Sequence, residues 1–216
     1  MYETIVFDLD GTLLDTLDDL ADSVNVALAA FNFPTRTREE IRTFVGNGMV
    51  SLMQLSCGRT DYPQFDELLW TFKRHYAAHC KDKTKAYDGI YPLLERLRAD
   101  GKKLAMLSNK AHFAVKDLAN DYFPDAFDTV QGENESEGIR KKPAPDALFA
   151  IMRALGAEKE KTVLIGDSEV DIQTAKNAGV DAILVSWGFR GRQFLKEHGA
   201  TVIVDTAEEI IKLCGE

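Results

Sequence analysis

The stretch ETIVFDLDGTLLDT, residues 3–16, begins with an apolar run and then places two acids close together. Residues 4–7, TIVF, have the composition of a buried strand, and Asp8 and Asp10 follow where that strand would end. Two such carboxylates repel each other, and burying either one without a partner is costly or forces it to take up a proton. We therefore look in the rest of the chain for residues that could stabilise this pair of acids beside Gly11.

The second half of the chain alternates apolar runs with amphipathic stretches of helical period. The runs, expected to be buried strands, are KLAML (103–107), TVLIG (162–166), AILVS (182–186) and TVIV (201–204). The stretches, expected to be helices, are 111–120, 145–155, 169–178 and 206–213. Strands that alternate with helices are typical of a parallel sheet covered on both faces. We therefore expect a three-layer, Rossmann-like α/β core, with residues 4–7 as one of its strands.

Residues 15–84 have a different character, because they contain successive helical segments, such as DELLWTFKRHYAAHC (66–80), and no good strand candidate. A helical block placed after the first strand of an α/β unit predicts an inserted, all-helical cap domain. The expected domains are a core of residues 1–14 and 85–216 and a cap of residues 15–84. The charged run GENESEGIRKKPAPD (132–146) is the candidate for an extended loop.

Composition and charge exclude several classes of protein. The net charge of −9 disfavours binding to nucleic acid, and a phosphate ligand would need positive charge supplied locally. No segment is long and apolar enough to cross a membrane, and the N-terminus has no basic region leading into an apolar one. Three scattered cysteines form neither a disulfide framework nor a zinc spacing. We expect a cytoplasmic protein.

Ligands of open α/β sheets collect outside the carboxyl ends of the strands, so the residues that follow each apolar run are the candidates for a site. The first run is followed by Asp8, Asp10, Gly11 and Thr12. The run 103–107 is followed by Ser108 and Asn109, and the run 162–166 by Asp167 and Ser168, with Asp171 one turn later. Lys142 can reach the same edge from a loop.

This gathering of acids fits Mg²⁺, which favours a few carboxylates together with waters and substrate phosphate. We expect Asp8 and Asp167 to hold the ion, and the backbone carbonyl of Asp10 to face it. Gly11 allows a sharp bend and the approach of backbone N–H groups to an anion. Thr12 could add a hydroxyl to the site or cap the segment that follows.

The chemistry that suits these residues is transfer of a phosphoryl group to a carboxylate. Asp8 would attack phosphorus and form an aspartyl-phosphate, which splits one difficult step into two. Asp10 would protonate the leaving alkoxide and later take a proton from the attacking water. Lys142 and the metal would supply positive charge, with Ser108 and the amide of Asn109 as hydrogen-bond donors.

Four segments, FDLDGTLLDT, LSNK, KKPAPD and GDSEVDI, resemble in order the four motifs of the haloacid dehalogenase superfamily of phosphatases. The resemblance covers essentially the whole chain and includes a helical cap after the first motif. It implies the same roles for Asp8, Asp10, Ser108, Lys142 and Asp167, and favours Lys142 over Lys141. It also implies that Asp171, beside Ser168, supports the metal or Lys142.

Within this superfamily, SNK, KPAPDALF, VSWGFRG and FVGNGMVSLM are most similar to phosphoglycolate phosphatases. The resemblance thus implies 2-phosphoglycolate, a small phosphorylated metabolite, as the substrate of a monomer or homodimer. Two departures are Ser108, where that group commonly has threonine, and Phe189–Arg190, where a tyrosine is expected first. The second leaves the substrate open.

Several alternatives remain at this point. A pyrophosphatase and a β-phosphoglucomutase-like enzyme are close to the leading interpretation, although GDSEVDI is unlike the corresponding mutase motif. A phospho-accepting receiver domain would be about half this length and lack a cap, and an inactive binding module would not need every side chain that is present.

In the expected cap, Gly46, Asn47 and Gly48 form either a specificity loop or a simple turn between helices. Contacts with a substrate carboxylate are conceivable for three basic residues, Arg42, Lys73 and Arg74. His75 and His79 lie four residues apart, but without a third ligand we interpret them as a solvated helix face and not as a zinc site.

Overall fold

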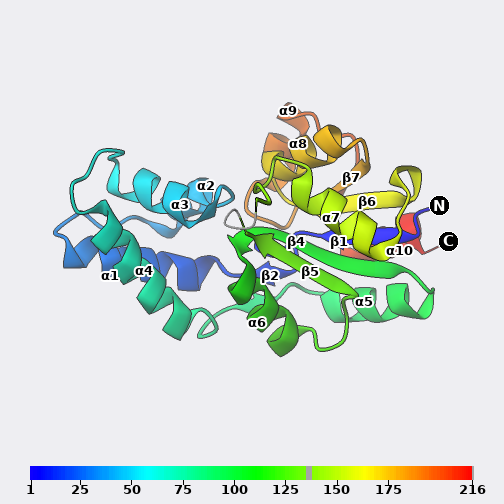
Figure 1. Cartoon of the computed structure of the whole chain (residues 1–216), viewed down its shortest axis with the longest axis horizontal. Helices are drawn as coiled ribbons and strands as arrows, with labels where there is room; N and C mark the ends of the chain where they lie inside the picture. Colours follow the sequence, from blue (N-terminus) through cyan, green and yellow to red (C-terminus); the bar gives the residue numbers. More distant parts are fainter. Residues whose placement is uncertain (135–137, 216) are drawn as a thin grey trace. The chain divides into compact units, whose positions relative to one another are not determined.

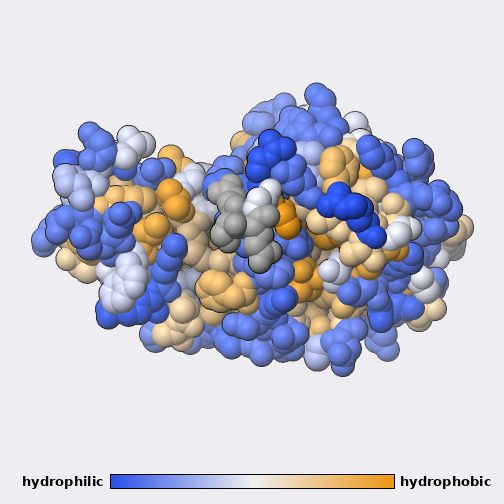
Figure 2. Space-filling view, viewed as in Figure 1, coloured by the Kyte–Doolittle hydropathy of each residue, from blue (hydrophilic) through white to orange (hydrophobic). Residues whose placement is uncertain are grey.

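The computed structural model describes residues 1–134 and 138–215. The chain divides into two compact units, which we call the core unit (Met1–Leu13 and Ala86–Glu216) and the helical unit (Leu14–Lys85). Among the described residues, no helix is both long and apolar enough to cross a membrane. Hydrophilic side chains cover most of the face seen in Figure 2, and apolar ones reach it in separate places.

The core unit is built on a six-stranded sheet with the order β5-β4-β1-β6-β7-β8, in which every described pairing is parallel. Its strands are β1 (Thr4–Phe7), β4 (Lys103–Ala111), β5 (Thr129–Glu133), β6 (Thr162–Gly166), β7 (Asp181–Val185) and β8 (Ile203–Val204). The central strand β1 lies between β4 and β6, and Phe7 is in register with Met106 and Ile165. The residues that follow these three strands are therefore delivered to one edge.

Helices cover both faces of this sheet, with α7 and α8 on one face and α5 and α6 on the other (Figure 1). Because side chains alternate along a strand, Val6 packs with Leu148 of α7 and Ala175 of α8, whereas the Phe7 ring meets Phe127. The helices of the core unit are α5 (Ile90–Ala99), α6 (His112–Tyr122), α7 (Asp146–Leu155), α8 (Glu169–Ala178), α9 (Gly191–Glu197) and α10 (Ala207–Cys214). This arrangement confirms the predicted three-layer α/β fold.

The helical unit contains α1 (Leu17–Ala30), α2 (Arg38–Phe44), α3 (Gly48–Cys57) and α4 (Phe65–His79). Its core includes the fully buried side chains of Leu28, Met53, Leu68 and Phe72. Thr37 begins α2 with a reciprocal cap, because its hydroxyl accepts from the Glu40 N–H while the Glu40 carboxylate accepts from the Thr37 N–H.

Several elements differ from the sequence-based expectations. The first is a pair of two-residue strands, β2 (Leu14–Asp15) and β3 (Lys85–Ala86), which are too short to leave an apolar run, so the expectation of no strand in residues 15–84 was wrong at Asp15. The strand expected at 103–107 continues to Ala111, and the one expected at 201–204 comprises Ile203–Val204.

The expected loop 132–146 also needs a correction at its start. Residues 129–133, TVQGE, form the edge strand β5, whose side chains are mostly half-buried, so that its sequence lacks the apolar run of an interior strand. Within the expected loop, residues 135–137 lie outside the described part of the chain, and Asp146 begins α7.

Candidate active site

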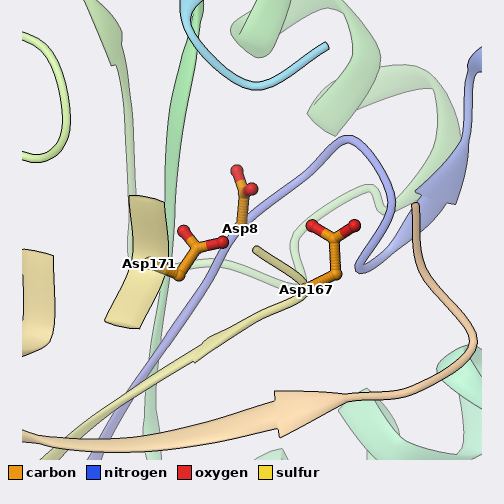
Figure 3. Close-up of side chains that lie close together, drawn as sticks. All are labelled: Asp8, Asp167 and Asp171. Atoms are coloured by element: carbon orange, nitrogen blue, oxygen red, sulfur yellow. The ribbon is translucent and has the colours of Figure 1, made fainter. Parts of the chain in front are cut away.

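The carboxyl ends of β1, β4 and β6 bring together the acids that the sequence places after β1 and β6. Asp8 follows β1, Asp167 follows β6, and Asp171 lies in the first turn of α8. All three are buried, and one ligand oxygen of each lies within 4.8 Å of the others. The close-up in Figure 3 shows the three carboxyl groups gathered around a common space.

Burial disfavours the charged forms of Asp8 and Asp167. It raises the pKa of Asp8 to about 7, although the ammonium group of Lys142 acts in the opposite direction. Burial, together with the neighbouring charges of Asp171 and Asp8, also raises the pKa of Asp167 well above its usual value. The described residues thus place too little positive charge near these three acids to balance three negative charges.

Lys142 provides the ammonium group at this cluster. Its Nζ lies 2.9 Å from Asp8 Oδ1 and 2.7 Å from Asp171 Oδ1, and its side chain is buried. Burial alone would lower the pKa of Lys142, but the charges of Asp171 and Asp8 raise it overall, so the side chain stays charged. The family resemblance implies that Asp171 supports either the metal or Lys142, and the contact with Lys142 is present.

The backbone of Lys142 is held by the side-chain amide of Asn109. The Lys142 N–H donates to Asn109 Oδ1 at 2.7 Å, and Asn109 Nδ2 donates to the Lys142 carbonyl at 2.9 Å. The expected contribution of Asn109 was a donor to phosphate. Its side chain fixes the loop that carries the lysine, and the role of Asn109 as a donor to phosphate stays a prediction.

Asp171 is fixed by Ser168 at the start of α8. Its Oδ2 accepts from the Ser168 N–H at 3.2 Å and from Ser168 Oγ at 2.7 Å, while Oδ1 receives Lys142. A Cβ at Gly166 would overlap the Asp171 carboxyl group, so a residue without a side chain at the end of β6 allows this close approach. Both Asp171 oxygens are engaged, which makes it a support for Lys142.

Asp167 is held by the segment that follows β7. The Phe189 N–H donates to Asp167 Oδ2 at 2.6 Å, and a Cβ at Gly188 would overlap both Asp167 Cβ and the Gly11 carbonyl oxygen. Gly11 has a φ of +84° and also lies against the Asp167 carboxyl group. Sequence reasoning missed the role of Gly188 and Phe189, although the glycine in VSWGF after a predicted strand was an available signal.

Asp10 is not part of the three-carboxylate cluster. Its two oxygens lie 2.8 and 2.9 Å from Nζ of Lys110, a residue that sequence reasoning left without a role. Lys110 belongs to the quoted segment LSNK at the end of a strand, and that position was the signal that could have found it.

The remaining predicted residues of this edge are also buried. Ser108 accepts a hydrogen bond from the Lys110 N–H at 3.2 Å. The Thr12 carbonyl accepts from Trp187 Nε1 at 3.1 Å. Among the described residues, nothing hydrogen-bonds to the buried hydroxyl of Thr12. This hydroxyl is therefore available to a ligand.

The predicted residues of the helical unit lie on α2 and α4 and around the connection between α2 and α3. Gly46 and Asn47 lie between α2 and α3, and Gly48 begins α3, with positive φ at both glycines. The guanidinium of Arg42 pairs with Glu39 at 2.8 Å, and that of Arg74 lies over the Trp70 ring. Lys73 is an exposed residue of α4.

The histidines of α4 each have a neighbour in the helical unit. His75 Nδ1 lies 3.0 Å from Ser23 Oγ, and His79 Nδ1 lies 2.8 Å from Asp82. In the described part of the chain, no group of three or more potential metal ligands includes either histidine. The absence of a zinc site at these histidines stays a prediction.

Comparison with known proteins finds a matching family and similar relatives. A family model described as haloacid dehalogenase-like hydrolase matches residues 5–185. A phosphoglycolate phosphatase of Pseudomonas syringae pv. tomato is 32% identical over 218 residues, covering 97% of this chain and 79% of the relative. The pyrophosphatase PpaX of Halalkalibacterium halodurans is 28% identical over 213 residues, covering 98% and 96%.

A solved structure is similar over the full length. It is a protein of Lactobacillus delbrueckii subsp. bulgaricus described as a "putative phosphoglycolate phosphatase", with a TM-score of 0.91 and 41% identity. The alignment covers 100% of this chain and 99% of that one.

Proposed function

This chain belongs to the haloacid dehalogenase-like hydrolase family as a phosphatase, and we propose that it hydrolyses 2-phosphoglycolate with Mg²⁺ through an aspartyl-phosphate on Asp8. The observation that supports this proposal best is the contact of Asp8 with Lys142 inside a cluster of three buried carboxylates. A small phosphorylated anion is the substrate class that suits such a site and that the names of these relatives have in common.

The residues present fit a divalent metal. The charges of Asp8, Asp167 and Asp171 are buried with one lysine, and burial raises the pKa of both Asp8 and Asp167. In the described part of the chain, no hydrogen bond goes to Asp8 Oδ2 or Asp167 Oδ1, so each acid keeps an oxygen for an ion. Asp8 and Asp167 would hold Mg²⁺ together with the Asp10 carbonyl. When bound, the ion supplies positive charge to the acids and to the phosphate oxygens.

Asp8 is oriented for nucleophilic attack by two donors on the same oxygen. Its Oδ1 receives the Leu9 N–H at 2.7 Å and Lys142 Nζ at 2.9 Å, and these two donors fix the orientation of the carboxylate that forms the bond to phosphorus. As that bond forms, the bond between phosphorus and the ester oxygen breaks. Lys142, held by Asp171 and Asn109, stabilises the negative charge of the transferring group.

Asp10 completes both half-reactions. In the first, its carboxylic acid gives a proton to the leaving alkoxide, and in the second its carboxylate takes a proton from the water that attacks phosphorus. Inorganic phosphate then leaves, and Asp8 is regenerated. Ser108, the N–H groups around Gly11, and the Thr12 hydroxyl are the further donors to phosphate in this proposal.

The helical unit serves as the cap domain in this proposal, and its connection Gly46–Gly48 contributes to the choice of substrate. We place the enzyme in the cytoplasm as a monomer or homodimer that acts on small metabolites. Light scattering of the purified protein measures its oligomeric state.

A second candidate substrate is inorganic pyrophosphate, because the relative PpaX is a pyrophosphatase that aligns over 96% of its own length. Both substrates can be tested together. Purified protein with Mg²⁺ is assayed for phosphate release from 2-phosphoglycolate, pyrophosphate and β-glucose 1-phosphate, with Asp8→Asn as the control. The highest kcat/KM is expected for 2-phosphoglycolate; a preference for pyrophosphate would replace the substrate, and activity in Asp8→Asn would remove the nucleophile.

A further inference from the structure

Lys110 is a buried lysine near the carboxyl end of β4, and its ammonium group contacts the carboxylate of Asp10. The side chain of Lys110 is only 4% exposed, and its Nζ lies within 2.9 Å of both oxygens of Asp10. The neighbouring acid Asp8 contacts a different lysine, Lys142. Asp8 and Asp10, two residues apart in sequence, thus contact the buried ammonium groups of two different lysines.

The backbone of Lys110 is fixed from two sides. Its N–H donates to Ser108 Oγ at 3.2 Å, and a Cβ added to Gly132 of β5 would lie 2.6 Å from its carbonyl oxygen. Gly132 therefore lets β5 approach the end of β4 more closely than any other residue could. A fixed backbone restricts where the long Lys110 side chain can place its ammonium group.

Resting on the role proposed for Asp10, we propose that Lys110 is a positioning residue that keeps the Asp10 carboxyl group out of the metal-binding cluster. The cluster of potential ligands contains Asp8, Asp167 and Asp171 but not Asp10, although Asp10 is the nearest acid in sequence to Asp8. A carboxylate this close in sequence to Asp8 would otherwise compete for the divalent ion, because hard cations favour carboxylate oxygens. Bound there, it could not exchange a proton with the ester oxygen.

The chemical consequence depends on the leaving group. An alkoxide such as that of 2-phosphoglycolate needs a proton as it leaves, whereas the phenolate of p-nitrophenyl phosphate leaves without one. Loss of a correctly placed acid should therefore slow the first ester selectively. A lysine that binds the phosphoryl group itself would affect both esters.

The test compares wild type, Lys110→Met, Asp10→Asn and the double variant on these two esters with saturating Mg²⁺. We expect Lys110→Met to lower kcat for 2-phosphoglycolate about 10- to 100-fold with little change in KM, since general acid catalysis contributes about 10²–10⁴-fold. Activity on p-nitrophenyl phosphate should change less than about 3-fold in the first step, measured as the burst of p-nitrophenol. Because Lys110 acts through Asp10, the double variant should equal Asp10→Asn.

Lys102→Met is the matched control. Lys102 is also a buried lysine, next to the other end of β4, and its Nζ donates to the Tyr2 carbonyl at 2.8 Å. It should show no selectivity between the esters. Thermal melts check the folding of each variant, and Lys110→Gln, which keeps a donor without the charge, replaces Lys110→Met under the same criteria if that variant does not fold.

Equal losses on both esters, or losses in Lys110→Met and Asp10→Asn that multiply in the double variant, would overturn the positioning role. A crystal structure of Lys110→Met with Mg²⁺ gives a readout that is independent of turnover. An Asp10 carboxyl group turned toward the metal supports the proposal, and one that has not moved contradicts it. If wild type hydrolysed neither ester, the proposed function would fail, while the crystal structure would still decide the role of Lys110.

Discussion

Asp19 of the helical unit and Asp167 of the core unit are both only 2% exposed, yet they are surrounded very differently. Asp19 accepts from the N–H groups of Lys83 and Thr84 and from Thr84 Oγ1, at 2.8 to 3.1 Å. These neutral donors of its own unit satisfy both oxygens. Asp167 has the Phe189 N–H on one oxygen and the charges of Asp171 and Asp8 nearby.

The comparison separates two uses of a buried acid. A carboxylate surrounded by backbone donors ties two segments together, because removing it would leave those donors buried without partners. Burial and neighbouring negative charges destabilise the charged form of the other kind of carboxylate. Such a carboxylate favours the binding of a cation, because the described chain does not supply enough positive charge around it. The five predictions below start from this distinction and run from the largest expected effect to the smallest.

Asp8→Asn should abolish turnover while leaving the protein folded. Loss of a nucleophile that carries the covalent step costs about 10⁴-fold or more in kcat. Phosphate release from 2-phosphoglycolate measures this loss, and circular dichroism confirms the fold. Residual activity above about 1% of wild type would place Asp8 outside the chemistry, since loss of a merely assisting group costs about 10²-fold.

Asp19→Ala should have the opposite profile. It removes the acceptor of the buried Thr84 N–H and hydroxyl and of the Lys83 N–H, at about 1–3 kcal/mol for each donor that water cannot reach. We expect the free energy of unfolding, measured in urea, to fall by about 3 kcal/mol in total. A variant as stable as wild type would show that Asp19 does not tie these segments together.

In metal-free protein, Asp8→Asn should also be more stable than wild type at pH 8. The pKa of Asp8 is raised to about 7 in the folded state, so its contribution to stability is present at low pH and is lost as pH rises through that value. Asn has no such titration, and each kcal/mol it relieves raises Tm by about 2–4 °C. Thermal melts in EDTA should show this advantage at pH 8 and lose it near pH 4.

Mg²⁺ should remove the same difference at pH 8 by stabilising wild type more than Asp8→Asn, because only wild type offers the charged acid. Equal melting shifts in the two proteins would argue against Asp8 as a metal ligand.

Thr12→Val should give the smallest change. The hydroxyl has no hydrogen-bond partner among the described residues, so its replacement by a methyl group of similar size should alter stability by less than about 1 kcal/mol. If the hydroxyl donates to phosphate, inhibition by inorganic phosphate should weaken about 10-fold. An unchanged inhibition constant would assign Thr12 to packing alone.

The order of strands and acids was predictable from sequence because each buried strand leaves an apolar run with a clear end. The runs before Asp8 and Asp167 predicted β1 and β6 with their bounds, and the parallel fold followed. The edge strand β5 was not predictable in this way. Its side chains are mostly half-buried, so polar residues are tolerated there and its sequence has no apolar run. Strand register, and not any local pattern, decides which acids meet.

The partners of individual side chains were harder to predict. Lys110 and Asp10 lie far apart in sequence, and a lysine after a strand is ordinarily exposed, so nothing local indicates their contact. Gly188 is another example, because it acts through its lack of a Cβ near Asp167 and Gly11. Such close approaches depend on how loops cross in space.

The position of β1 in the middle of the sheet also affects how the protein is made on the ribosome. The strand that carries Asp8 is translated first, but its neighbours β4 and β6 begin at Lys103 and Thr162. The helical unit, a continuous stretch of chain, can fold during translation while the first strand waits without partners. A nascent chain therefore cannot bring Asp8 and Asp167 together until most of it has been synthesised.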